Sequence, residues 1–207
     1  RQEWINMKYD FDLEERRFSK QFILKLLITL VEAVIVVFLA FTITRYGLEK
    51  MTVSGEYMSP TLKSGDCVLI NKLSYRFHKI HRNDVIVVRQ TGSEHSYFSL
   101  ERVIGLPGER VQIKEGQVYI NDKKLKEKLS YPLMDNGGLA EDVVTLDKNE
   151  YFVLGDNRNE CEDSRNAAVG NISRKSIVGK AWIRMNSFTF VGMINNFRKE
   201  DTSSDLQ

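Results

Sequence analysis

Cysteine is scarce in this chain, and neither sign of charge is in clear excess. The only two cysteines are Cys67 and Cys161, too few for a disulfide framework or a zinc-ligand cluster. We expect no metal and no cofactor, and the sequence leaves open whether these two residues pair with each other. Lys and Arg number 30 against 28 Asp and Glu, so the net charge of +2 gives no electrostatic reason to expect binding to nucleic acid.

Apolar residues make up 42% of the chain, but they are unevenly distributed. Residues 22–44, FILKLLITLVEAVIVVFLAFTIT, form one long apolar run. As a helix that rises about 1.5 Å per residue, this run would be roughly 35 Å long, which is enough to cross a lipid bilayer. The following residues, TRYGLEKM, lack the small residues of a signal-peptide cleavage site. We therefore expect an uncleaved transmembrane anchor.

The basic residues near the two ends of this run suggest its orientation. Three precede the run and two follow it: Arg16, Arg17 and Lys20, then Arg45 and Lys50. Because cytoplasmic flanks carry more Lys and Arg, this small bias favours a cytoplasmic tail of residues 1–21. Residues 45–207 would then form an extracytoplasmic domain at the cell membrane.

Two charged residues interrupt the apolar run. Glu32 lies near its middle, and Lys25 lies seven residues earlier on roughly the same helical face. A central carboxylate costs about 2.5–3.5 kcal/mol on insertion scales, and the many apolar neighbours can absorb this cost. Two interpretations stay open. Glu32 is simply tolerated, or it is protonated or paired with a polar group on the membrane helix of a partner.

After the apolar run, short apolar segments alternate with turn residues, a pattern typical of a single mainly β domain. The predicted strands are DCVLINKL, NDVIVVRQ, ERVIGL, RVQI, QVYI, EYFVLGD and SIVGKAWIRM. RVQIKEGQVYI predicts a hairpin around Glu115 and Gly116, because Gly readily takes a positive φ. The polar residues 123–148 are expected to form a loop or a small insertion. In this domain only residues 188–198 have a helical pattern.

Four segments of the domain, in order, resemble the sequence boxes of type I signal peptidases of the Gram-positive type. These are membrane-bound Ser-Lys endopeptidases that cleave secretory signal peptides. The segments are VSGEYMSPTLKSGD, RNDVIVV, ERVIGLPGERV and YFVLGDNRNECEDSR, and the resemblance covers about residues 53–181. It implies an antiparallel β domain in which a substrate peptide is added as a strand beside the nucleophile segment.

The departures from the family pattern fall where the resemblance would place the chemistry. The nucleophilic Ser of the family stands before a Met, and here Tyr57 has that place. The Lys base corresponds to Glu101, and a supporting serine corresponds to Cys161. A phenol with a pKa of ~10 replaces a small alcohol, and a buried Glu tends to become a neutral acid rather than a base. We expect Tyr57 to pack over the old site and to hydrogen-bond Glu101.

Two relocated nucleophiles are less favoured by the sequence. Ser59 lies two residues from the family position and is fixed by the following proline, so a role in a turn is the simpler interpretation. Cys161 would need a histidine, and His78 and His81 lie in the polar stretch RFHKIHRND, which is typical of a solvated loop.

The last of the four segments, residues 151–165, is called the last box below. It also carries charged residues that match structural positions of the family: Asp156, Arg158, Asp163 and Arg165. We expect the two aspartates to bond Arg158, Arg165 and nearby backbone, since bidentate pairs of this kind hold loops in place. A two-carboxylate protease built from Glu101 with one of the aspartates is the less favoured alternative.

A signal-peptidase fold with both catalytic positions replaced implies an inactive, membrane-anchored binding or chaperone-like accessory protein. Similar proteins of Gram-positive pilus operons assist pilin assembly with sortases, so a pilin and a sortase are the partners that the resemblance implies. An extended segment of the secreted partner is expected in a groove formed by Val53, Ser54, Gly55, Glu56 and Leu100. Two alternatives stay open: an active endopeptidase for signal peptides or prepilins with an altered or relocated nucleophile, and a regulator that binds signal peptides without cutting them.

Overall fold

The computed structural model describes the backbone of residues 2–91, 96–127 and 129–193, and the side chains of most of these from Lys20 onward. The chain divides into two compact units. The first comprises residues 1–46 and the second residues 47–207. The boundary lies close to the division at residues 44 and 45 that the sequence predicts.

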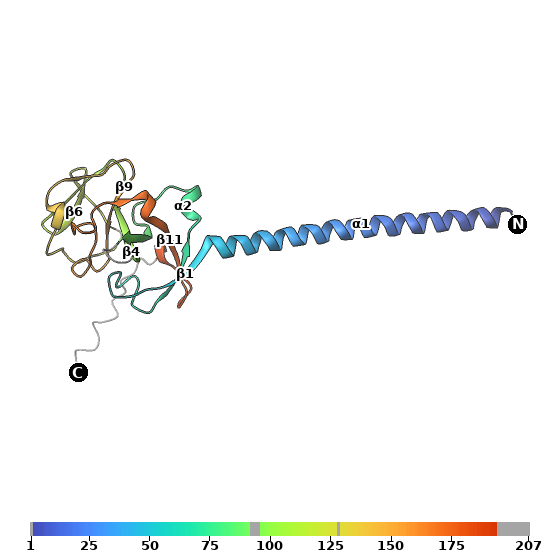
Figure 1. Cartoon of the computed structure of the whole chain (residues 1–207), viewed down its shortest axis with the longest axis horizontal. Helices are drawn as coiled ribbons and strands as arrows, with labels where there is room; N and C mark the ends of the chain where they lie inside the picture. The colour runs from blue at the N-terminus through green and yellow to red at the C-terminus, as the bar shows by residue number, and fades with distance from the viewer. Residues whose placement is uncertain (1, 92–95, 128, 194–207) are drawn as a thin grey trace, which may run out of the picture. The chain divides into compact units, whose positions relative to one another are not determined.

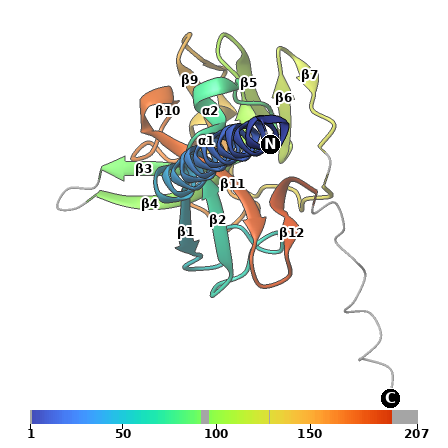
Figure 2. The same cartoon turned by 90° about the vertical axis from the view of Figure 1, so that its right-hand side faces the viewer.

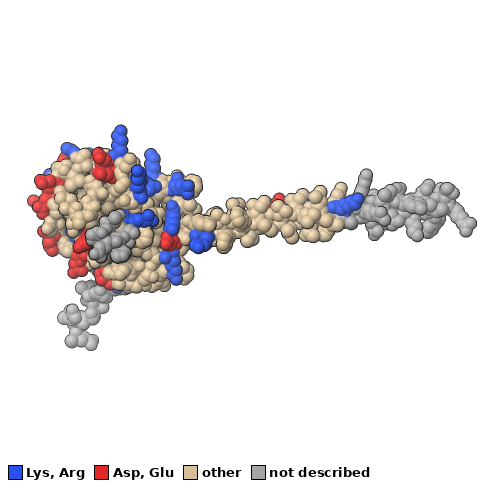
Figure 3. Space-filling view, in the orientation of Figure 1, with Lys and Arg blue, Asp and Glu red and all other residues tan. Residues whose placement is uncertain are grey.

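The first unit is a helix, α1 (Gln2–Gly47), which joins the charged N-terminal residues and the apolar run without a break. Its segment Lys20–Gly47 is long and apolar enough to cross a membrane. This segment contains the anchor predicted at 22–44, and Figure 3 shows most of its surface free of charge. The hydroxyls of Thr29 and Thr42 donate to backbone carbonyls four residues earlier, so they need no water in apolar surroundings.

The larger sheet of the second unit is antiparallel and has eight strands (Figure 2). Seven follow one another in space in the order β1 (Leu48–Thr52), β2 (Cys67–Asn71), β11 (Ile177–Arg184), β3 (Val85–Thr91), β4 (Ser96–Gly105), β9 (Glu150–Leu154) and β10 (Ile172–Ser173). The eighth, β12 (Thr189–Phe190), pairs with the end of β11. The mainly antiparallel β fold expected from the sequence is confirmed.

A smaller sheet has the order β7 (Lys123–Lys124), β6 (Gln117–Ile120), β5 (Arg110–Lys114) and β8 (Val144–Thr145). Figure 1 shows β6 on the side of the domain away from β1. The predicted hairpin joins β5 to β6, with positive φ angles of 50° at Glu115 and 70° at Gly116. Residues 123–148 are mostly loop, as expected. The short helices are α2 (Ser74–Phe77), η1 (Gly138–Glu141), η2 (Arg174–Ser176) and η3 (Val191–Met193).

The helical pattern at residues 188–198 is the exception. Thr189 and Phe190 pair with the end of β11, and residues 191–193 make one 3-10 turn. Phe190 also faces Trp182, with 6.0 Å between the ring centroids. Strand pairing and this ring contact therefore outweigh local helical propensity at the start of the segment, and residues 194–198 lie outside the described residues.

Buried apolar side chains form three clusters that hold the sheets together. One lies beneath residues 53–66, the segment VSGEYMSPTLKSGD that is called the first box below. It contains Met58, Leu62 and Val85. A second joins the small sheet to β9 through Val111, Leu146 and Phe152, and the third lies around Ile86 and Val103. The alternation of buried and exposed residues along β2 and β6 is the pattern from which these strands were predicted.

Phe152→Ala should lower the free energy of unfolding by about 3–5 kcal/mol, because the ring is fully buried and its loss leaves a cavity. Phe77→Ala is the matched control, since this ring is exposed on α2. Chemical denaturation of the full chain in detergent measures both changes. Equal effects of the two substitutions would contradict the proposed contribution of the second cluster.

Candidate functional site

The first box is a loop that is closed at its base and anchored in the core. The backbone N–H of Val53 donates to Asp66 (2.8 Å), and the N–H of Gly65 donates back to Val53 (2.9 Å). Met58 and Leu62 are buried in the first apolar cluster. These side chains fix the loop from below, and Tyr57, which directly precedes Met58, lies at the domain surface.

A pocket of about 310 Å³ lies between this loop and β4. Its lining is apolar on several sides and includes two carboxyl groups: Met51, Val53, Ser54, Tyr57, Met58, Gln90, Tyr97, Phe98, Ser99, Leu100, Glu101 and Glu162. Of the residues predicted to form a peptide groove, Val53, Ser54 and Leu100 line the pocket. Gly55 and Glu56 belong to the same loop but are not part of the lining.

The strand that borders this pocket has an open edge. β4 pairs with β3 along residues 96–102, but with β9 only from Arg102 to Gly105. In the described part of the chain, no strand pairs with the second edge of residues 97–101. Unpaired N–H and C=O groups at such an edge can accept another extended chain.

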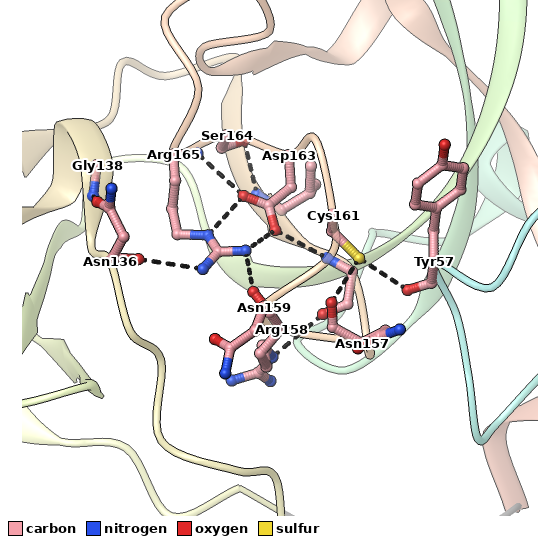
Figure 4. A network of polar contacts seen from close by, with 12 residues as sticks. Tyr57, Asn136, Gly138, Asn157, Arg158, Asn159, Cys161, Asp163, Ser164 and Arg165 are labelled. Atoms are coloured by element: carbon pink, nitrogen blue, oxygen red, sulfur yellow. Dashed lines mark hydrogen bonds and ion pairs between the residues drawn. The ribbon is translucent and has the colours of Figure 1, made fainter.

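Tyr57 does not make the contact that the sequence led us to expect. Its side chain is 52% exposed, and Figure 4 shows the ring turned away from Cys161. The ring packs against Gly55, where an added Cβ would lie only 2.7 Å from Tyr57 Cε2. The Tyr57 carbonyl accepts from the N–H of Asn157 (3.0 Å) and from Cys161 Sγ (2.9 Å). These bonds fix the Tyr57 backbone with its carbonyl toward Cys161, and the ring lies over Gly55.

Glu101 is the buried acid of the pocket. The prediction that Tyr57 donates a hydrogen bond to it is wrong. Glu101 is 3% exposed, and its Oε2 atom has no hydrogen-bond partner in the part of the chain that the structure describes. Burial is the main cause that raises the pKa of this carboxyl well above its ordinary value, followed by the negative charge of Asp163. A hydrogen bond with Ser99 acts in the opposite direction. Burial therefore favours the protonated, neutral form of this carboxyl.

Cys161 carries a free thiol, as does Cys67, so the two do not form a disulfide. Burial, and then the charge of Glu101, raise the pKa of the Cys161 thiol to about 12. Its Sγ atom contacts the carbonyls of Tyr57 and Asn157 (2.9 and 2.8 Å). The sulfur is also packed against Gly155, where an added Cβ would lie 2.1 Å away. This protonated, enclosed thiol is unsuited to nucleophilic attack.

The remaining candidates for a relocated site have local partners. His78 Nδ1 lies 3.2 Å from the carbonyl of Ser74, and the backbone N–H of His81 donates to Asp84. Among the described residues no hydrogen bond joins either histidine to Cys161. The N–H of Ser59 donates to the carbonyl of Glu56 (3.0 Å), which places Ser59 in a turn as expected.

Asp156 pairs with Arg102, which corrects the expectation that it bonds Arg158 or Arg165. Arg102 Nε donates to Oδ1 (2.6 Å) and Nη2 to Oδ2 (2.5 Å), and both side chains are buried. Two hydroxyls also donate to this carboxylate, Thr61 Oγ1 (2.5 Å) and Tyr131 OH (3.0 Å). The carboxylate therefore joins the first box, β4 and the loop before η1.

Arg158 has a different partner, Glu127, to which both of its terminal nitrogens donate. Its guanidinium also lies 3.7 Å from the ring centroid of Tyr131. Sequence reasoning missed Glu127 because it stands in the polar insertion, outside every box. It also missed Arg102, although this residue directly follows the predicted base position.

Asp163 and Arg165 form the bidentate pair that was expected (Figure 4). Arg165 Nε donates to Oδ1 and Nη2 to Oδ2, each at 2.8 Å. The N–H of Gly155 also donates to Asp163, and Arg165 donates to the carbonyls of Arg158 and Asn136. These bonds fold the last box into a fixed loop beside the pocket.

Lys25 and Glu32 lie on α1. Among the described side chains, neither takes part in an ion pair within the chain. Contact of Glu32 with the membrane helix of a partner stays a prediction.

Glu101→Gln is expected to raise the melting temperature at pH 7–8 but not near pH 4. The unfolded carboxyl ionises near its ordinary pKa of 4.5, whereas the folded one keeps its proton to higher pH. Wild-type stability is therefore fully present below that value and falls as pH rises toward the raised pKa, by up to about 1.4 kcal/mol per pH unit. Thermal unfolding across this range tests the effect. Glu160→Gln, an exposed change of the same charge, should show no such trend, and a pH-independent gain in Glu101→Gln would contradict the assignment.

Asp156→Asn should destabilise the domain by about 3–5 kcal/mol, because it leaves the buried Arg102 guanidinium without a charged partner. Asp122→Asn is the control, since the Arg110–Asp122 pair is exposed and its loss should change stability little. Urea denaturation compares the two. Similar losses of stability in the two variants would show that the buried Arg102–Asp156 pair contributes no more to stability than the exposed pair does.

Comparison with known proteins identifies the family of this chain. The family model "Signal peptidase, peptidase S26" matches residues 26–186. Signal peptidase IB of Staphylococcus aureus is 32% identical over 205 residues, which cover 89% of this chain and 100% of that protein. Signal peptidase I V of Bacillus subtilis is 38% identical over 138 residues, 61% of this chain and 79% of that one. A crystal structure of a signal peptidase I from Enterococcus faecalis covers 50% of this chain and 97% of its own, with 29% identity and a TM-score of 0.41. The chain belongs to the signal peptidase (peptidase S26) family, and its apolar N-terminal helix indicates a membrane-anchored protein.

Proposed function

We propose that this chain is a catalytically inactive member of its family that binds an extended peptide of a secreted protein. The main observation in support is the state of Tyr57 and Glu101, the two residues at the nucleophile and base positions. Tyr57 is exposed and its ring points away from Cys161, and Glu101 is a buried carboxyl whose raised pKa favours its protonated form. A Ser-Lys dyad needs an unprotonated amine that can take the proton of a nearby hydroxyl. A protonated carboxyl cannot accept that proton.

The other groups around the pocket do not replace the dyad. The raised pKa of Cys161 keeps its thiol protonated at neutral pH. Asp156 and Asp163 are engaged in bidentate pairs with Arg102 and Arg165, so they do not form a carboxyl dyad with Glu101. These contacts favour a binding role over chemistry.

Two features of the site support peptide binding. The pocket has apolar walls suited to side chains, and the open edge of β4 beside it offers backbone hydrogen bonds. Together they match the requirements for an added strand, in which main-chain bonds supply affinity and alternate side chains enter pockets. Val53, Ser54 and Leu100 would form the walls of this groove.

We further propose that the bound segment belongs to a pilin and that the protein acts in pilus assembly together with a sortase. The support is its likeness to signal-peptidase-like accessory proteins whose dyad is replaced. In this proposal residues 45–207 face the outside of the cell and residues 1–21 the cytoplasm. Glu32 would contact the membrane helix of a partner.

A competing function is an active signal peptidase or prepilin peptidase. It is favoured by the relatives in S. aureus and B. subtilis that carry the name signal peptidase, and by the intact pocket. The two proposals differ in one measurable property, which is cleavage of a preprotein.

Full-length protein in detergent should leave both a secretory preprotein and a prepilin uncleaved. Tyr57→Ser combined with Glu101→Lys and Cys161→Ser should gain cleavage, and Tyr57→Ser alone, which lacks a base, should not. A general base contributes roughly 10²–10⁴-fold, so the difference should be visible on a gel. If the wild type cleaves either substrate and loses this activity in Tyr57→Phe or Glu101→Gln, the proposed inactivity is wrong.

A photo-crosslinking amino acid placed at Phe98 distinguishes the binding partners, because this side chain lines the pocket and is half exposed. Capture of mature pilin segments in cells would support the pilus role. Capture of signal peptides alone would instead support a regulator that binds them without cleavage. The same crosslinker at Phe77, which is outside the pocket, is the control.

A further inference from the structure

The described lining of the pocket contains carboxyl groups but no basic side chain. Two carboxyl groups, Glu101 and Glu162, contribute to its lining, and no lysine or arginine does so among the described residues. The other walls include the apolar side chains of Met51, Val53 and Leu100. A pocket of this composition disfavours an anion and suits a ligand group that is apolar along its length and positive at its end.

The Oε2 atom of Glu101 identifies where such a positive end would lie. Glu101 is 3% exposed, and none of the described residues supplies a hydrogen-bond donor to Oε2. The nearby arginines do not supply one, because Arg102 and Arg165 each direct two nitrogens at an aspartate. Buried polar atoms are nearly always hydrogen-bonded, so an orphan in a pocket wall points to a donor that arrives with a ligand.

We infer that the pocket receives a lysine side chain of the extended peptide. This inference rests on the proposed peptide binding at the same groove. The four methylenes of lysine would lie along the apolar walls, and its ammonium would donate to Oε2 of Glu101. The cost of removing the Glu101 side chain from water is incurred when the protein folds, so the ligand adds only the desolvation of its own ammonium.

The geometry favours lysine over other side chains. Arginine presents a rigid fork that is best matched by two free acceptors. Among the described residues Oε2 is the one buried side-chain oxygen without a partner, while Ser99 bonds the Glu101 side chain. An apolar side chain of the same length would fill the pocket but leave Oε2 without a donor. Lysine therefore satisfies both the shape and the single open acceptor.

The test uses three fluorescent nonapeptides of alternating threonine and valine that differ only in the central residue. This residue is lysine, acetyl-lysine or norleucine, so the stem is kept while the charge is removed. Fluorescence polarisation with the full-length protein in nanodiscs should show that the lysine peptide binds roughly 10–100-fold more tightly, as expected for a hydrogen bond to a charged group. Carbodiimide should then couple the lysine amine to Glu101, as mapped by mass spectrometry.

Variants of the protein test whether Glu101 is the residue that causes the preference for the lysine peptide. Glu101→Gln should reduce the difference between the lysine and norleucine peptides to less than about threefold, while the norleucine peptide keeps its affinity. Glu160→Gln removes the same charge from the neighbouring loop and should leave the preference unchanged. A preference that survives Glu101→Gln, or coupling of the amine to other carboxyls only, would overturn the inference.

The outcomes separate this inference from the proposed function. Equal binding of all three peptides would overturn the lysine site while leaving peptide binding at the groove intact. Absence of binding by every peptide, including a library of secreted-protein segments, would overturn both.

Discussion

The buried carboxylate of Asp156 is the interaction on which the domain around the pocket depends. It accepts two bonds from Arg102 on β4, one from Thr61 in the first box and one from Tyr131 in the insertion. Together with Asp156 itself, these three residues come from four separate parts of the sequence. Because an unpaired buried charge is costly, the segments must stay together for the carboxylate to remain satisfied. The shape of the pocket wall follows from the fixed positions of these segments.

Around this centre, the walls of the pocket have different origins. Met58 and Leu62 fix one wall from the core, and the backbone of β4 forms another. The loop of the last box, held by the Asp163–Arg165 pair, presses Cys161 against the carbonyl of Tyr57. None of these contacts involves proton transfer. The shape of the recess therefore does not depend on a working dyad, which is what the proposed binding of an extended chain requires.

The sequence predicts the parts of this protein that depend on local pattern. The anchor follows from one apolar run, the strands from alternation, and the Asp163–Arg165 pair joins residues only two positions apart. The Arg102–Asp156 pair joins residues that are 54 positions apart, so periodicity carries no signal for it. The direction of the Tyr57 ring could not be predicted from the sequence either, because the Tyr57 backbone is held by hydrogen bonds from a loop that is distant in the sequence.

Adjacent residues of β4 separate stability from binding. Successive side chains of a strand point to opposite faces, so Arg102 reaches Asp156 while Glu101 borders the pocket. Residue 101 can therefore change without breaking the buried ion pair at residue 102. Substitutions at the pocket-facing positions of β4 can therefore alter what the pocket binds while the buried ion pair that stabilises the domain is kept.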